Sequence, residues 1–250
     1  MNHPIVLAFQ AGLLTTMLNA VGAVPVLFMK RISQRMLDIG LGFASGVMIA
    51  ASFTSLILPG IEIGGVLPVL AGIILGTVAV SFADRVIPHM HRIIGMEGMP
   101  TGRFRALWLF VIAVTLHNMP EGLAVGVGFG SENLADAMAL AIAIGLQNIP
   151  EGMSIGFSTI SIEGTPRWKA FLVSFLSGLV ELPLSVLGAA LVSLTKPIIP
   201  YAMGFAGGAM MFVVSDEMIP ETHRMGHERL ASYGLVIGLI VMLTLDVLLG

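Results

Sequence analysis

Residues 147–152 read Gln-Asn-Ile-Pro-Glu-Gly and are the most informative stretch of this chain, because residues 117–122 anticipate them as His-Asn-Met-Pro-Glu-Gly. Each stretch puts a carboxylate, together with amide or imidazole groups, in the middle of an apolar segment long enough to span a membrane. A charged side chain at the centre of a bilayer costs roughly 2.5–3.5 kcal/mol on insertion scales. Because the chain carries this cost twice, in one pattern, we expect the charged residues to have a function. The types of donor atom suggest a duplicated half of a metal site.

The composition is typical of a protein that crosses a membrane many times. Hydrophobic residues make up 56% of the chain and charged residues only 11%, against about 25% charged residues in soluble domains. The mean hydropathy is +0.95, and apolar runs of about twenty residues, the length of a transmembrane helix, recur from end to end. The 30 glycines suit helices that pack closely in lipid, and the absence of cysteine excludes disulfides and thiolate metal ligands.

We predict an all-α polytopic membrane protein in which residues 1–250 form a single transmembrane domain. Long apolar segments separated by mostly short loops indicate eight spanning helices. The expected helices cover residues 4–29, 36–60, 66–88, 104–130, 133–160, 168–194, 198–220 and 231–249.

The basic residues indicate which side of the membrane each loop faces. Cytoplasmic loops carry an excess of Lys and Arg, and every basic residue except Lys196 falls in or beside the loops after the first, third, fifth and seventh expected helices. These loops are therefore expected in the cytoplasm, and both termini outside. The residues concerned are Lys30, Arg31, Arg35, Arg85, Arg92, Arg103, Arg105, Arg167, Lys169, Arg224 and Arg229.

The chain contains two internal repeats. The fourth and fifth expected helices align without gaps at an offset of thirty residues, and residues 42–48 (Gly-Phe-Ala-Ser-Gly-Val-Met) are echoed by residues 204–210 (Gly-Phe-Ala-Gly-Gly-Ala-Met). Both pairs join helices of opposite sense, so the repeats are inverted with respect to the membrane. We therefore predict a 3+2+3 inverted-repeat bundle, an architecture in which transporters bind their substrate near the midplane on broken helices.

The paired motifs bring ligands and unpaired backbone carbonyls together. The proline of each motif cannot donate a backbone hydrogen bond, so the carbonyl four residues earlier loses its helical partner. His117 and Glu121 are four residues apart and share one helix face, as do Gln147 and Glu151. Across two packed helices they would form a His/Glu/Gln/Glu cluster, whose carboxylates a divalent cation would neutralise.

The donor types also restrict the ion. Imidazole with carboxylates suits Zn²⁺, Fe²⁺, Mn²⁺ or Co²⁺, whereas Ca²⁺ and Mg²⁺ prefer oxygen ligands alone. Asn118 and Asn148 could join the carboxylates in a neighbouring all-oxygen site, which Glu181 on the sixth expected helix could reach. The sequence thus indicates one or two adjacent cation sites.

On these residues the chain resembles the ZIP (Zrt/Irt-like) metal transporters, especially their bacterial GufA-type branch. The resemblance covers essentially the whole chain and rests on the two motifs, the helix count and residues 42–48. It implies a transporter, not an enzyme, that takes up a divalent metal ion across the bacterial inner membrane. Zinc is the leading substrate, Fe²⁺, Mn²⁺, Cd²⁺ and Co²⁺ are further candidates, and no resident cofactor is expected.

The resemblance further implies two neighbouring metal sites at the midplane. One departure from the family pattern is Asn148, where some members carry aspartate, and this substitution removes a charge from the second site. The first site would use His117, Glu121, Gln147 and Glu151 with Met48 nearby, and the second would use Asn118, Asn148, Glu121, Glu151 and Glu181.

The resemblance also implies roles for residues near both ends of the pathway, with the first, fourth, fifth and sixth helices moving against the others in an elevator-like motion. Met48, Ser55 and Glu62 are spaced by seven and are expected on one face of the second helix. The outer entrance would use Ser55, Glu62 and Asp246, and release to the cytoplasm would use Asp84, His89, His91, Asp216 and Glu217.

Several alternatives stay open. The buried acids could be protonated or hydrogen-bonded, the asparagines could join helices, and Met48 could be core packing. The alternative functions are a proton- or sodium-coupled carrier of another substrate and, less favoured, an intramembrane metalloenzyme, because no His-Glu-x-x-His helix exists. Metal ions and the bilayer are the expected partners, nucleic acid is not, and small-residue faces permit a homodimer.

Overall fold

The computed structural model describes residues 3–29, 31–86, 103–131, 133–160, 165–223 and 226–249, without the side chains of residues 84–86, 103–114 and 117. Within these residues the secondary structure is helical and no strand occurs, which confirms the all-α expectation. The helices are α1 (Pro4–Ala23), η1 (Val24–Leu27), α2 (Gln34–Ala51), η2 (Ser52–Ile57), α3 (Leu58–Gly64), α4 (Val66–Val86), α5 (Arg103–Gly130), α6 (Leu134–Ile160), α7 (Arg167–Leu179), α8 (Glu181–Leu194), η3 (Lys196–Ile198), α9 (Ile199–Val213), η4 (Val214–Met218), α10 (Ile219–His223) and α11 (Glu228–Leu249).

The expected helix over residues 168–194 is divided into α7 and α8 by a turn at Val180. Pro183 accounts for the division, because it has no N–H to donate to the carbonyl of Leu179 four residues earlier. Glu181 is consequently the first residue of α8. A buried acid at a helix break is the arrangement expected of a transporter site.

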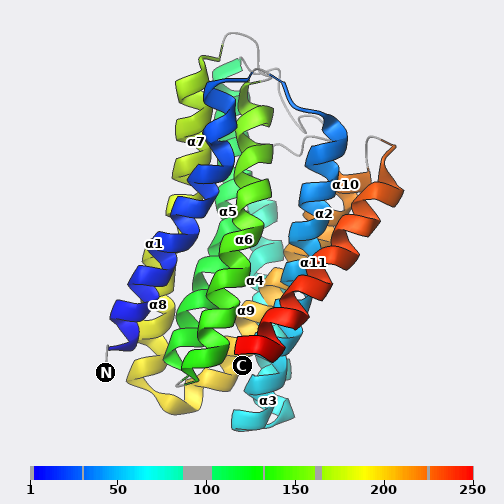
Figure 1. The fold of residues 1–250 in the computed structure, drawn as a ribbon. Coiled ribbons are helices and arrows are strands. Elements are labelled where there is room, and N and C mark those ends of the chain that lie inside the picture. The colour runs from blue at the N-terminus through cyan, green and yellow to red at the C-terminus, as the bar shows by residue number, and fades with distance from the viewer. Residues whose placement is uncertain are drawn as a thin grey trace.

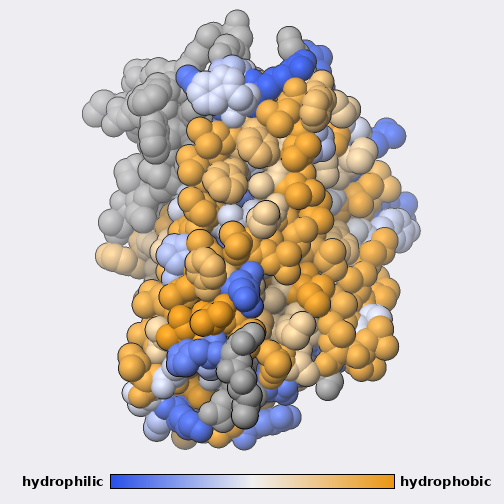
Figure 2. Space-filling model, turned by 60° about the vertical axis from the view of Figure 1, so that its left-hand side comes forward, coloured by the Kyte–Doolittle hydropathy of each residue, from blue (hydrophilic) through white to orange (hydrophobic). Residues whose placement is uncertain are grey.

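The molecule has the surface of an integral membrane protein. Six helical segments of the described chain are long and apolar enough to cross a membrane. Large side chains on α4 face outward, with Leu67, Ile74 and Phe82 being 80%, 62% and 65% exposed. On the face in Figure 2 apolar residues cover most of the surface, and hydrophilic residues gather toward its two ends. α5 and α6, which carry the motifs, are not among the six.

The helices pack in two groups that lie side by side in Figure 1. In the first group α1 packs against α6 and α8, and α5 packs against α8; in the second, α2 packs against α11 and α4 against α9. Contacts of α6 with α2 and of α5 with α9 join the groups. α5 and α6 therefore lie where the two groups meet, and both chain termini lie at one end of the bundle (Figure 1).

Two helices loosen into π-helical turns at equivalent points. The segment η2 begins at Ser52 and η4 begins at Val214, a separation of 162 residues. The sequence echo from Gly42 to Gly204 has the same separation. A π turn makes i→i+5 hydrogen bonds and so takes more residues than an α turn. The expectation that Met48, Ser55 and Glu62 share a helix face therefore does not hold across η2, because seven residues no longer restore the same direction.

Candidate functional site

A carboxylate and a carboxamide from the two motifs meet between α5 and α6. Gln147 Nε2 donates a hydrogen bond of 2.5 Å to Glu121 Oε1. Both side chains are fully buried, with 0% exposure. A buried carboxylate is stable only when it is paired, hydrogen-bonded or bound to a cation. The predicted pairing of the two motifs is thus present for this couple of residues.

A second carboxylate lies next to the motif of α6. Asn148 Nδ2 lies 2.8 and 2.9 Å from the two carboxylate oxygens of Glu181, the first residue of α8. The same amide group is 3.2 Å from the backbone carbonyl oxygen of Thr15 on α1. The neighbouring residues Gln147 and Asn148 therefore reach two different acids, one on α5 and one on α8.

The glycine that ends each motif permits close approach of another helix. A Cβ atom at Gly122 would lie 2.6 Å from the Cα and the carbonyl oxygen of Glu181, so α8 can approach α5 only because this side chain is absent. A Cβ atom at Gly152 would collide in the same way with the backbone carbonyl oxygen of Asn19 on α1. The motif glycines thus position α8 and α1 beside the polar residues.

The remaining predicted midplane residues are buried at the same meeting of helices. Asn118 is 1% and Glu151 is 4% exposed. Met48 is fully buried in the apolar cluster that also contains Val125 of α5 and Ile144 of α6. The side chain of His117 lies outside the described part of the structure. Among the side chains that are described, no three His, Cys, Asp or Glu groups form a set able to hold a metal ion.

Amide oxygens are further candidate metal ligands beside these acid and imidazole groups. Asn118 Oδ1, Gln147 Oε1 and Asn148 Oδ1 are buried, and no described residue donates a hydrogen bond to any of them. The amide groups of Gln147 and Asn148 are oriented by their bonds to carboxylates, which accept and cannot donate when ionised. Their oxygens are thereby left as buried acceptors, and an unsatisfied buried polar atom costs roughly 1–3 kcal/mol.

The predicted entrance residues lie near a cavity at the end of the bundle that holds the termini. Ser55 Oγ donates a 3.4 Å hydrogen bond to Asp246 Oδ1 on α11. Ser55 and Glu62 also line a cavity of about 390 Å³ between η2, α3 and the α5–α6 connection. Asp136, which sequence reasoning missed, lines the same cavity.

The predicted release residues are less well tested. Asp216 is exposed and Glu217 is half-buried on the π segment η4. His89 and His91 lie outside the described residues, as does the side chain of Asp84, whose backbone belongs to α4.

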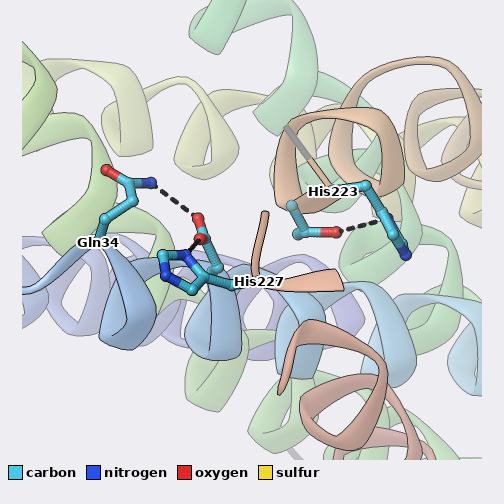
Figure 3. A network of polar contacts seen from close by, with 5 residues as sticks. Gln34, His223 and His227 are labelled. Atoms are coloured by element: carbon cyan, nitrogen blue, oxygen red, sulfur yellow. Dashed lines mark hydrogen bonds and ion pairs between the residues drawn. The ribbon is translucent and has the colours of Figure 1, made fainter. Parts of the chain in front are cut away.

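A further polar cluster joins α2 to the start of α11. Gln34 Nε2 donates to Asp38 Oδ1 at 2.7 Å, and His227 Nδ1 lies 2.8 Å from Asp38 Oδ2. Asp38 is fully buried. Figure 3 shows His227 and Gln34 meeting the carboxylate from two sides, whereas His223 points away to contact Ile219 and Thr222 on its own helix. Sequence reasoning missed Asp38, which belongs to no repeated motif.

An apolar helical bundle with buried acids and amides between two helix groups defines a class, the multi-spanning transporters of small ions. Comparison with known proteins narrows the class. The ZIP Zinc transporter family model matches residues 95–246. Zinc transporter ZIPB of Bordetella bronchiseptica is 41% identical over 98% of this chain and 81% of the relative. Zinc transporter GufA of Myxococcus xanthus is 36% identical, over 96% and 98%. Human Zinc transporter ZIP11 is 33% identical, over 93% and 94%.

The chain therefore belongs to the ZIP zinc transporter family. The predicted family resemblance is confirmed, and so is the interpretation as a membrane transporter and not an enzyme. Asp38 and Asp136 carried no signal that sequence reasoning could have used, since single acids near helix ends are common in solvated loops.

Proposed function

We propose that this protein moves divalent transition-metal ions, zinc foremost, into the cytoplasm by alternating access through a midplane site. The observation that carries the proposal is the group of buried acids and amides contributed by α5, α6 and α8. Glu121, Gln147, Asn148 and Glu181 are each at most 1% exposed. The relatives' names, all zinc transporters, supply the substrate class.

We assign the ligands to two neighbouring positions. The contact of Glu121 with Gln147 marks the first, to which His117 and Glu151 belong by their i,i+4 spacing. The contact of Asn148 with Glu181 marks the second, with Asn118 and both motif carboxylates as further donors. Imidazole and carboxylate donors suit Zn²⁺ among the divalent transition metals, and the second, oxygen-only position lacks the charge that an aspartate at residue 148 would give.

The proposed topology is eight spans in inverted repeats, with both termini outside and the protein in the bacterial inner membrane. Helix contacts support this topology. The inverted repeat makes α1 equivalent to α7–α8, α2 to α9, α4 to α11, and α5 to α6. Under this equivalence the contact of α1 with α6 corresponds to that of α8 with α5. The contact of α2 with α11 likewise corresponds to that of α9 with α4. These four are the most extensive contacts of the bundle. The equal spacing of the two π segments agrees with the same equivalence.

The proposed pathway begins at the cavity lined by Ser55, Glu62 and Asp136 and ends near Asp216 and Glu217. Acids in a cleft with apolar walls raise the local concentration of cations. Transport then requires the group of α1 and α5–α8 to move against the other group, an elevator-like motion for which the packing in two groups provides the two bodies.

Uptake into proteoliposomes tests the function. Purified protein is reconstituted with a metal-sensitive dye inside the vesicles, and Zn²⁺, Cd²⁺ and Mn²⁺ are added outside in turn. We expect Zn²⁺ and Cd²⁺ fluxes well above those of empty vesicles. Protein-containing vesicles that admit these three ions no faster than empty ones would refute the proposal.

A further inference from the structure

A carboxamide on α1 stands outside both motifs, in the same polar region. Asn19 lies about two thirds of the way along the apolar segment Pro4–Leu27 and is 1% exposed. A buried polar residue within a membrane span is expensive and usually functional. It belongs to neither repeated motif, and the two-site assignment does not include it.

Hydrogen bonding fixes the orientation of this amide. Asn19 Nδ2 donates a 2.7 Å hydrogen bond to the backbone carbonyl oxygen of Ser174 on α7. Because a carbonyl oxygen only accepts, the nitrogen must occupy this end of the amide. The oxygen Oδ1 points to the other side, where it is buried and no described residue donates to it.

The free oxygen faces the helix of the second motif. A Cβ atom built at Gly152 would lie 2.6 Å from Asn19 Oδ1, while one built at Gly178 would meet Asn19 Nδ2. Asn19 is thus held between two glycines, with its oxygen beside the residue that follows Glu151. Its nitrogen is held against α7.

The position of Asn19 extends the second proposed position by one helical turn. Thr15 and Asn148 are in contact through the backbone oxygen of Thr15. Four residues later on the two helices, Asn19 adjoins Gly152. Each step of four residues advances about one turn, or roughly 6 Å, and leads away from the end that holds the termini. In the proposed topology this is the cytoplasmic direction.

We propose that Asn19 Oδ1 is an additional oxygen ligand for the divalent cation, contributed by α1 on the cytoplasmic side of Asn148 and Glu181. This inference rests on the proposed function. Amide oxygens are ligands for hard and borderline divalent cations. Because Ser174 holds the amide nitrogen of Asn19, the oxygen has a fixed position. No described residue donates to it a hydrogen bond that would compete with the cation. The ion would meet this oxygen as it leaves the Asn148–Glu181 position.

Three variants separate a ligand from a structural hydrogen bond. Asn19→Leu removes the oxygen and the donor, and Asn19→Asp keeps an oxygen but loses the donor to Ser174. Thr16→Val is the matched control, because Thr16 Oγ1 donates a 3.0 Å bond to Gly178 from the same stretch of α1 and is equally buried. Cd²⁺ uptake at sub-saturating metal is measured for each, together with the Cd²⁺-induced rise in melting temperature in detergent.

We expect Asn19→Leu to lower the uptake rate at least about tenfold, Thr16→Val to stay within about twofold of wild type, and Asn19→Asp to keep uptake and a Cd²⁺-induced stabilisation at least equal to wild type. Wild-type uptake by Asn19→Leu, or an Asp variant as impaired as the Leu variant in both measurements, would overturn the assignment. Should Asn19→Leu fail to fold, the Asp variant alone decides, through its Cd²⁺-induced stabilisation. A wild-type protein without flux would instead refute the proposed function, while the melting measurement would still test Asn19.

Discussion

At the scale of single residues, the site combines buried carboxylates with amides whose oxygens accept no hydrogen bond from a described residue. Gln147 and Asn148 each use their nitrogen on a carboxylate and keep an oxygen that no described group satisfies. A cation placed among these oxygens would satisfy the amides and offset the charge of the acids together. Amides are therefore suitable neighbours for these buried carboxylates. A lysine in their place would displace the ion, because its own positive charge would pair with the carboxylates.

Glu151→Ala tests the first proposed position. The variant removes a buried carboxylate from the centre of α6, and we expect metal uptake in proteoliposomes to fall by about 100-fold or more, since even groups that only support metal ligands are worth 10–100-fold. The matched control is Glu228→Ala, which removes an exposed acid from the first turn of α11. Uptake at the wild-type rate by a correctly folded Glu151→Ala protein would contradict the assignment.

His227→Ala tests the Asp38 cluster. The change leaves one oxygen of a buried carboxylate without its donor, so we expect the free energy of unfolding to fall by about 1–3 kcal/mol. The melting temperature in detergent should drop accordingly. His223→Ala is the comparison, because His223 contacts Ile219 and Thr222 on its own helix and not Asp38. An equal loss in both variants would show that the contact with Asp38 has no special weight.

At the scale of helices, glycine and proline determine what can approach the site. Pro183 ends α7 so that Glu181 begins a new helix, and Gly122 allows that helix to touch α5. The position of Glu181 is therefore set by two residues that contribute no side-chain chemistry.

Gly122→Ala and Gly128→Ala form a matched pair on α5. The new Cβ at residue 122 would press on backbone atoms of Glu181 at 2.6 Å, which cannot yield without moving α8. At residue 128 the closest atom is Leu140 Cδ2 at 3.2 Å, the end of a flexible side chain. We expect uptake to fall more than about tenfold for the first variant and less than about twofold for the second. Similar rates for both would refute the role given to Gly122.

The sequence predicted the pairing of the motifs because their repetition is visible without a structure. Single residues could not be found in this way. Asn19 belongs to neither of the two repeated motifs, and its hydrogen-bond partner, the carbonyl of Ser174, lies 155 residues away in the chain. The π segments were equally invisible, since a loosened turn depends on tertiary packing and has no residue signature. Because of the π segment η2, the seven-residue spacing that begins at Met48 does not predict which side chains share a helix face.

At the scale of the whole molecule, two helix groups meet at the site, and each group contains helices from both halves of the chain. Neither half of the chain therefore contains a complete group. The division into groups was implied by the family resemblance and could not be derived from hydropathy, which identifies spans and says nothing about their neighbours.

The topology can be tested with single cysteines, because the chain has none of its own. Ser33 and Lys169 are exposed at the starts of α2 and α7, and Thr195 is exposed directly after α8. We expect a membrane-impermeant maleimide to label Thr195→Cys in intact cells, and to label Ser33→Cys and Lys169→Cys only after the membrane is opened. The same labelling side for Lys169→Cys and Thr195→Cys would exclude the proposed crossing of α7–α8.

The π segments also bear on how members of this family should be compared residue by residue. Each loosened turn accommodates extra chain within an otherwise regular helix. A relative that lacks one residue between positions 52 and 57 could form a regular α-helix there, with its later side chains facing as they do in this chain. Aligned without a gap, each later position would instead be matched with a side chain about 100° away around the helix. Equivalence to Ser55 or Glu62 should therefore be assigned only after a one-residue gap has been tried there, and after its twin has been tried between positions 214 and 218.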